Sequence, residues 1–131
     1  MALVNLLVLL AIFQFIYFGF RVGGARQKYG VSAPATTGHD IFERYYRVQM
    51  NTLELLIMLI PAVWISSAYW NPLFVAAMIG IYLIGRMIYL SAYVADPKKR
   101  DKGFAISILP IGVLLIAGVA GAVMSMLNTG I

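Results

Sequence analysis

The sequence contains no cysteine, a single histidine and few charged residues. Of its 131 residues, 62% are apolar and 11% are charged. A soluble domain carries about 25% charged residues, so this chain lacks the polar side chains that a water-facing surface needs. The absence of cysteine argues against a secreted module held together by disulfide bonds. We therefore expect a single integral membrane domain over residues 1–131.

The few charged side chains are confined to two blocks, residues 21–54 and 86–102. The remaining stretches, 1–20, 55–85 and 103–131, contain no Asp, Glu, Lys or Arg. Five Lys and Arg residues stand against three Asp and Glu residues in the first block, and five against two in the second, so both blocks are basic on balance. Basic loops between apolar stretches indicate contact with anionic lipid headgroups or an anionic solute, not with nucleic acid.

The apolar stretches predict four membrane-spanning helices, because about 20 apolar residues cross the hydrocarbon layer of a bilayer. The fold class is therefore all-α, a four-helix membrane bundle. A cleaved signal peptide would carry its positive charge before the first apolar run, whereas here the basic residues follow it. The expected spans are about 2–20, 41–66, 72–95 and 103–126.

Local signals suggest where these helices begin and end. Arg21 and Gly23-Gly24 are expected to close the first, and Asp40 with Glu43 predicts a capping box at the start of the second. Pro72 suits the first position of the third helix, which should end before Asp96-Pro97.

An even number of spans places both basic blocks on the same side of the membrane. The other side receives the two termini and the short turn near residues 66–72. The positive-inside rule therefore predicts that the basic blocks are cytoplasmic. A bacterial inner membrane and the endoplasmic reticulum both fit this topology.

The second span carries an unusual stripe of polar side chains. At about 100° per residue, one helix face presents them together, and an ionised group at the bilayer centre costs about 2.5–3.5 kcal/mol. Two interpretations are open: an internal ion-pair network that fixes helix packing, or a polar cavity for a zwitterionic or polyanionic solute. We favour the cavity. The stripe consists of Glu43, Arg44, Arg47, Asn51 and Glu54.

Other polar residues extend this hypothesis. Gln49 points nearly opposite the stripe, where it either bonds a neighbouring helix or faces a second cavity formed with another subunit. The third span repeats the pattern, with Tyr82, Arg86, Tyr89 and Tyr93 at i, i+4, i+7 and i+11. Tyr93 alone would also suit the aromatic belt of a membrane interface.

Two loop residues complete the set of candidates. Arg100, in the basic segment DPKKRDK, is placed to close the opening of the cavity, although that segment would also serve as a positive-inside anchor. His39 has too few neighbouring ligands for a metal site, so we expect no metal and a histidine that is solvated or lies at the level of the lipid headgroups.

Three segments resemble one known family: ARQKYGVSAPATTG (25–38), FERYYRVQMNTLE (42–54) and GRMIYLSAYVADPKKR (85–100). They are similar to the membrane-associated proteins in eicosanoid and glutathione metabolism (MAPEG), and within that family to its microsomal glutathione transferase and leukotriene C synthase branch. The resemblance implies a homotrimer that binds glutathione between neighbouring subunits, toward the cytoplasmic side.

The resemblance also implies roles for individual residues. Arg26 and Gln49 would reach the site from the adjacent subunit, and Arg100 would stabilise the glutathione thiolate. Leu55 replaces an aromatic residue found in many relatives, and Gln27 replaces an arginine found in some. The residues implied to bind glutathione on one subunit are Arg47, Asn51, Glu54, Arg86, Tyr89 and Tyr93.

These residue types suit glutathione. Arginines match its carboxylates through bidentate hydrogen bonds, and Glu54 with Asn51 suits its ammonium group. A guanidinium close to the sulfur favours the thiolate over a thiol whose free pKa is about 8.5. We therefore expect a glutathione transferase for lipophilic electrophiles, with reduction of lipid hydroperoxides as a related activity.

Two alternatives come from other functional classes. A non-catalytic lipid-binding scaffold of the same family would bind lipophilic ligands without conjugating an electrophile. Arg100 argues against this branch. A small multidrug transporter would need a carboxylate that exchanges protons with a cation, whereas Glu54 has Arg47 and Asn51 on its own helix face.

Overall fold

The computed structural model describes residues 1–130 and contains four long helices and one short 3₁₀ helix. All four long helices are apolar and long enough to cross a membrane. The expected all-α four-helix architecture is thereby confirmed, and each long helix is a candidate membrane span. The elements are α1 (Ala2–Tyr29), α2 (Asp40–Ser67), α3 (Pro72–Ala95), η1 (Pro97–Lys99) and α4 (Asp101–Thr129).

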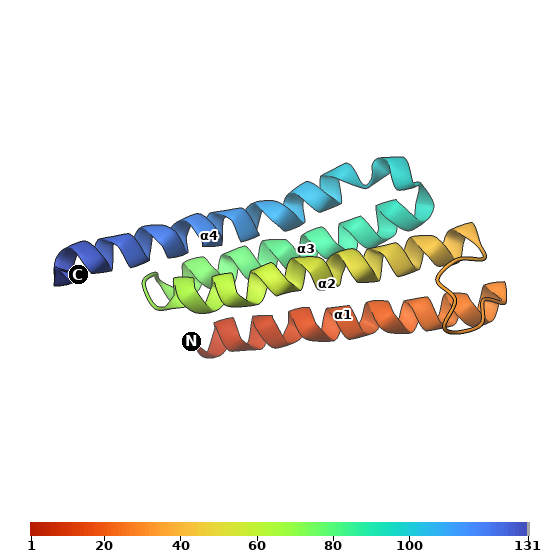
Figure 1. Ribbon diagram of the computed structural model, residues 1–131, viewed down its shortest axis with the longest axis horizontal. Coiled ribbons are helices and arrows are strands. Elements are labelled where there is room, and N and C mark those ends of the chain that lie inside the picture. The colour runs from red at the N-terminus through yellow and green to blue at the C-terminus, as the bar shows by residue number, and fades with distance from the viewer. Residues whose placement is uncertain (131) are drawn as a thin grey trace.

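The four long helices run side by side along the long axis of the molecule (Figure 1). The N-terminus, the turn between α2 and α3 and the C-terminal end of α4 lie toward one end of the bundle. The loop between α1 and α2 and the segment around η1 lie at the other end. Most of the basic residues therefore gather at one end of the bundle.

The first helix is longer than the sequence suggested. It continues through Arg21 and Gly23-Gly24 to Tyr29, so the expected end near residue 20 is wrong. Val22 and Ala25 are buried against the start of α2, and this packing offsets the weak helix propensity of glycine. Gly30, with φ 68°, adopts the left-handed conformation that ends the helix.

The second helix begins with a different cap from the predicted one. The Nδ1 atom of His39 accepts a hydrogen bond from the backbone N–H of Ile41 at 3.2 Å, so the expected Asp40–Glu43 capping box is wrong. The ring of His39 also stacks on Tyr29, with ring centroids 3.9 Å apart. His39 is thus a structural residue that joins the ends of α1 and α2, and not only a solvated one.

Helices α3 and α4 approach each other closely because small residues lie between them. A Cβ atom added to Gly85 would lie 2.7 Å from the Oγ atom of Ser107. Pro72 begins α3 and Asp96 follows its last residue, as the sequence predicted. The close contact fixes the start of α4, and therefore Arg100, relative to the polar face of α3.

Candidate functional site

A polar cavity of about 340 Å³ opens at the end of the bundle that carries the second basic block. It lies among α2, α3 and the start of α4. Five of the residues singled out from the sequence line it: Arg47, Asn51, Tyr89, Tyr93 and Arg100. The structure therefore brings together side chains from segments more than 50 residues apart in the sequence, Arg47 and Arg100 among them.

Directly beneath the cavity lies Arg86, whose side chain is 0% exposed. Its Nε atom donates to the Oγ atom of Ser107 at 2.9 Å, and its Nη1 atom donates to the Oδ1 atom of Asn51 at 2.8 Å. A longer bond of 3.3 Å runs from Nη1 to the Oγ1 atom of Thr52. The guanidinium also lies 4.2 Å from the ring centroid of Tyr89. Arg86 therefore supports the cavity and does not line it.

Two charged residues of the α2 stripe, Arg47 and Glu54, are not sequestered inside the chain. Arg47 and Glu54 are both exposed, and Glu54 lies midway along α2. The Nδ2 atom of Asn51 donates to the Oε2 atom of Glu54 at 3.4 Å. An internal ion-pair network would require Arg47 and Glu54 to be buried, so the geometry favours the cavity interpretation.

Arg26 and Gln49 lie away from this cavity within the chain. Arg26 donates to the backbone oxygen of Ala35 at 2.6 Å, and its guanidinium lies 4.7 Å from the ring centroid of Phe42. Gln49 is half-buried against Gly19 of α1. That they act from an adjacent subunit stays a prediction.

Two lining residues were missed from the sequence, Asp101 and Phe104. Phe104 follows Arg100 at i+4, and this spacing on a helix would have placed it on the same face. Arg44 was expected beside the cavity. It lines a smaller hollow of about 260 Å³ that shares Arg47, and it donates to the backbone oxygen of Val94 at 2.9 Å. Arg44 thereby binds the carbonyl end of α3.

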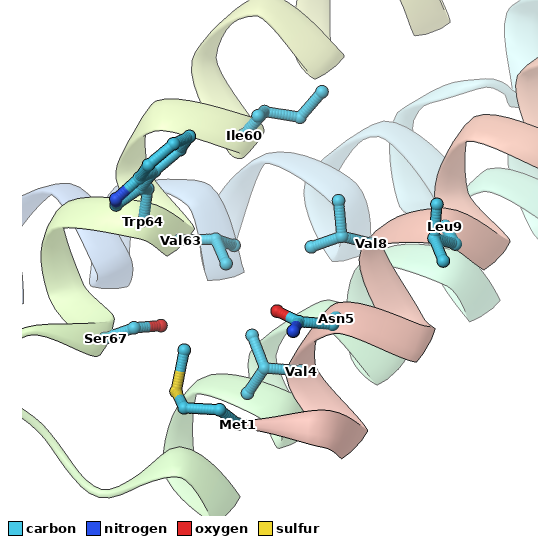
Figure 2. Close-up of a pocket in the computed structure, with 9 residues that line it drawn as sticks. All are labelled: Met1, Val4, Asn5, Val8, Leu9, Ile60, Val63, Trp64 and Ser67. Carbon is cyan, nitrogen blue, oxygen red and sulfur yellow. The ribbon is translucent and has the colours of Figure 1, made fainter.

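A second cavity, of about 410 Å³, lies near the opposite end of the bundle (Figure 2). The start of α1 and the end of α2 form it, mainly with apolar side chains such as Val8 and Trp64. Asn5 and Ser67 provide polar groups. No charged side chain from the described residues lines this cavity, so a charged ligand fits the first cavity and not this one.

Comparison with known proteins agrees with the resemblance seen in the sequence. The model of the MAPEG family matches residues 4–120. The chain belongs to the MAPEG family. It is 39% identical over 122 residues to an uncharacterized protein from Synechocystis, covering 93% of this chain and 86% of that one.

Two further MAPEG relatives have named activities. Human microsomal glutathione S-transferase 2 is 37% identical over 112 residues, covering 86% of this chain and 76% of the relative. Bovine leukotriene C4 synthase is 33% identical over 100 residues, covering 76% of this chain and 66% of the relative. The matched MAPEG region contains every residue of the candidate site.

Proposed function

We propose that this membrane protein is a glutathione transferase that joins the glutathione sulfur to lipophilic electrophiles. The observation that carries the proposal is the polar cavity, in which Arg47, Asn51, Tyr89, Tyr93 and Arg100 meet. The names of the relatives, a glutathione S-transferase and a leukotriene C4 synthase, support the same activity.

The cavity offers the groups that a charged tripeptide needs. Arg47 is placed to bind a carboxylate of glutathione, because a guanidinium and a carboxylate form two parallel charge-assisted hydrogen bonds. Glu54 lies outside the cavity wall but accepts a hydrogen bond from Asn51, which lines it, and from this position it would bind the ammonium group. Without such partners glutathione would lose more hydration free energy than it regains on entering the membrane.

Arg100 is the proposed catalytic residue. Its Nη1 atom donates to the backbone oxygen of Pro97 at 3.2 Å, which holds the side chain at the mouth of the cavity. The thiolate is the nucleophile, and a guanidinium nearby lowers the free energy of this anion relative to the thiol. Lowering the thiol pKa from about 8.5 to about 6.5 requires about 2.7 kcal/mol, which one well-placed cation supplies.

The reaction forms a bond between the glutathione sulfur and an electrophilic carbon. In a substitution, the bond between that carbon and the leaving group breaks, and the leaving group takes the electron pair. With an epoxide the carbon–oxygen bond breaks and the oxygen takes the pair and a proton, and with an activated double bond the π electron pair moves away from the attacked carbon and a proton is taken up. In the related peroxidase reaction, two glutathione molecules are oxidised to the disulfide, and a lipid hydroperoxide is reduced to an alcohol and water. The chain has no cysteine, so both thiols come from glutathione.

We propose that the working assembly is a homotrimer with each site between two subunits. Arg47 and Glu54 are exposed on a single chain, and Glu54 lies midway along α2, where an ionised group facing lipid costs about 2.5–3.5 kcal/mol. A neighbouring subunit that covers this face of α2 removes the cost. The neighbour would contribute Arg26 and Gln49, and the lipophilic substrate would enter along the apolar surface between subunits.

The expected orientation places the cavity at the cytoplasmic side, because it lies at the end of the bundle that carries the basic loop. Reduced glutathione is the main thiol of the cytoplasm, so this orientation gives glutathione access to the cavity. The membrane is a bacterial inner membrane or the endoplasmic reticulum.

An activity assay of the purified protein in detergent tests the proposal. The substrates are glutathione with chlorodinitrobenzene, and glutathione with a panel of lipid hydroperoxides. We expect glutathione-dependent conjugation that saturates with glutathione concentration. Binding of lipophilic ligands without any conjugation or peroxide reduction would indicate the non-catalytic scaffold. Proton-coupled efflux from liposomes that needs no thiol would indicate the transporter.

A further inference from the structure

We propose that Arg86 is a positioning residue, which fixes the amide group of Asn51 so that Asn51 meets glutathione as a hydrogen-bond donor. This inference rests on the proposed function and refines it. Arg86 is not part of the cavity wall, and its effect on glutathione would be transmitted through Asn51 and the ring of Tyr89.

The position of Arg86 is set by two buried hydroxyl groups. Ser107 and Thr52 are each 0% exposed, and both accept a hydrogen bond from the guanidinium. Ser107 in turn donates to the backbone oxygen of Gly103 at 2.6 Å, and Thr52 donates to that of Val48 at 2.8 Å. Each hydroxyl is therefore oriented by a helix carbonyl, with its oxygen lone pairs facing Arg86.

The guanidinium and Glu54 together determine which way the amide of Asn51 points. The Oδ1 atom accepts from Arg86 at 2.8 Å, and the Nδ2 atom donates to Glu54 at 3.4 Å. The reverse orientation would place an N–H group against the guanidinium and the carbonyl oxygen against the carboxylate. Both contacts would be repulsive. The amide thus retains one N–H group for the cavity.

Arg86 lowers the stability of the fold, and a role in binding would explain why an arginine stands at this position. The Nη2 atom of Arg86 is buried and has no hydrogen-bond partner within residues 1–130. A buried donor without a partner lowers the stability of a fold, and an apolar side chain at this position would avoid that loss. Orienting Asn51 and Tyr89 is the role that accounts for a buried guanidinium bonded only to neutral groups.

The test compares variants that loosen Arg86 without changing any residue of the cavity wall. Ser107→Ala and Thr52→Val each remove one hydroxyl, and Thr52→Ser keeps the hydroxyl. The kinetics are measured with glutathione and chlorodinitrobenzene on the full chain in detergent. We expect Ser107→Ala to raise KM for glutathione about tenfold with kcat nearly unchanged. Thr52→Val should raise this KM by a smaller factor, and Thr52→Ser should have the KM of the wild type.

Ser66→Ala is the matched control. Ser66 is also 0% exposed and donates to a helix carbonyl, that of Leu114 at 2.6 Å, but it lies outside the cavity and its support. The control should lower thermal stability about as much as Ser107→Ala and leave KM unchanged. Equal KM values for Ser107→Ala, Ser66→Ala and wild type would overturn the role of Arg86. A wild-type chain that binds no glutathione would instead overturn the proposed function, and this inference with it.

Discussion

Gly103 of α4 lies directly against the backbone of Tyr89 in α3. A Cβ atom added at Gly103 would lie 2.5 Å from the Cα atom of Tyr89. The start of α4 is therefore placed on α3 by backbone contact and not through flexible side chains. Because Tyr89 and Arg100 both line the cavity, this contact sets the distance between the two sides of the candidate site.

Replacing Gly103 with alanine should separate α3 from α4. The added methyl group meets backbone atoms that have no room to move, so we expect a loss of about 1–3 kcal/mol in stability. The change is measured as a lower unfolding temperature in detergent, together with lower turnover. Gly112→Ala is the control, because nothing lies within 4 Å of a Cβ atom at Gly112. If both variants unfold at the same temperature, the close contact is not structurally important.

Replacing Arg100 with alanine should greatly lower turnover and retain glutathione binding. We expect kcat to fall roughly 100-fold or more, the usual effect of losing a group that stabilises a developing anion. The residual activity should rise with pH toward the pKa of a free thiol, about 8.5, because the thiolate then forms without help. Stopped-flow absorbance of the thiolate and steady-state rates measure both effects.

Lys102→Ala is the control for Arg100→Ala. Lys102 is exposed, lies in the same basic segment and is not part of the cavity wall. Its removal should leave kcat and the pH profile unchanged. Wild-type turnover in Arg100→Ala would show that the segment is only a basic anchor.

Much of the fold could be predicted from the sequence because the membrane imposes it. The lengths of the apolar runs and the proline signals located α3 to the residue. The end of α1 was missed because an arginine followed by two glycines locally predicts the end of a helix. The helix continues because Val22 and Ala25 are buried against α2, a tertiary contact that local sequence does not reveal. The cap by His39 was missed because its ring nitrogen becomes an acceptor only in the folded geometry.

Part of the candidate site could be predicted from the sequence, and part of it depends on tertiary contacts. Helical spacing placed Arg47 and Asn51 on one face, and the cavity contains both. Spacing does not distinguish a side chain that lines a cavity from one buried behind it, so it could not separate Arg86 from Tyr89. That difference comes from Ser107 and Thr52, whose hydroxyl groups draw the guanidinium away from the cavity.

Replacing Glu54 with glutamine should weaken the binding of the glutathione ammonium group. A hydrogen bond to a charged partner contributes about 1.5–3 kcal/mol, so KM for glutathione should rise roughly 10-fold to 100-fold. A glutathione analogue that lacks the amino group provides the decisive comparison. Wild type should bind this analogue poorly, and Glu54→Gln should bind both thiols about equally. A variant that still prefers glutathione as strongly as wild type would place the ammonium elsewhere.

Mixed oligomers test whether each site is shared between subunits. If Arg26 reaches the cavity of a neighbour, subunits with Arg26→Ala and subunits with Arg100→Ala are each defective alone, but their mixtures contain some sites with both arginines intact. Co-expression with two different affinity tags, followed by purification on both, isolates these mixtures. We expect turnover per oligomer well above that of either variant alone, because an intact Arg100 then meets an intact Arg26 across the interface.

Mixtures no more active than the parent variants would place both arginines within one chain. Arg26, whose guanidinium here lies on Phe42 and bonds Ala35, would then serve only to hold its own loop.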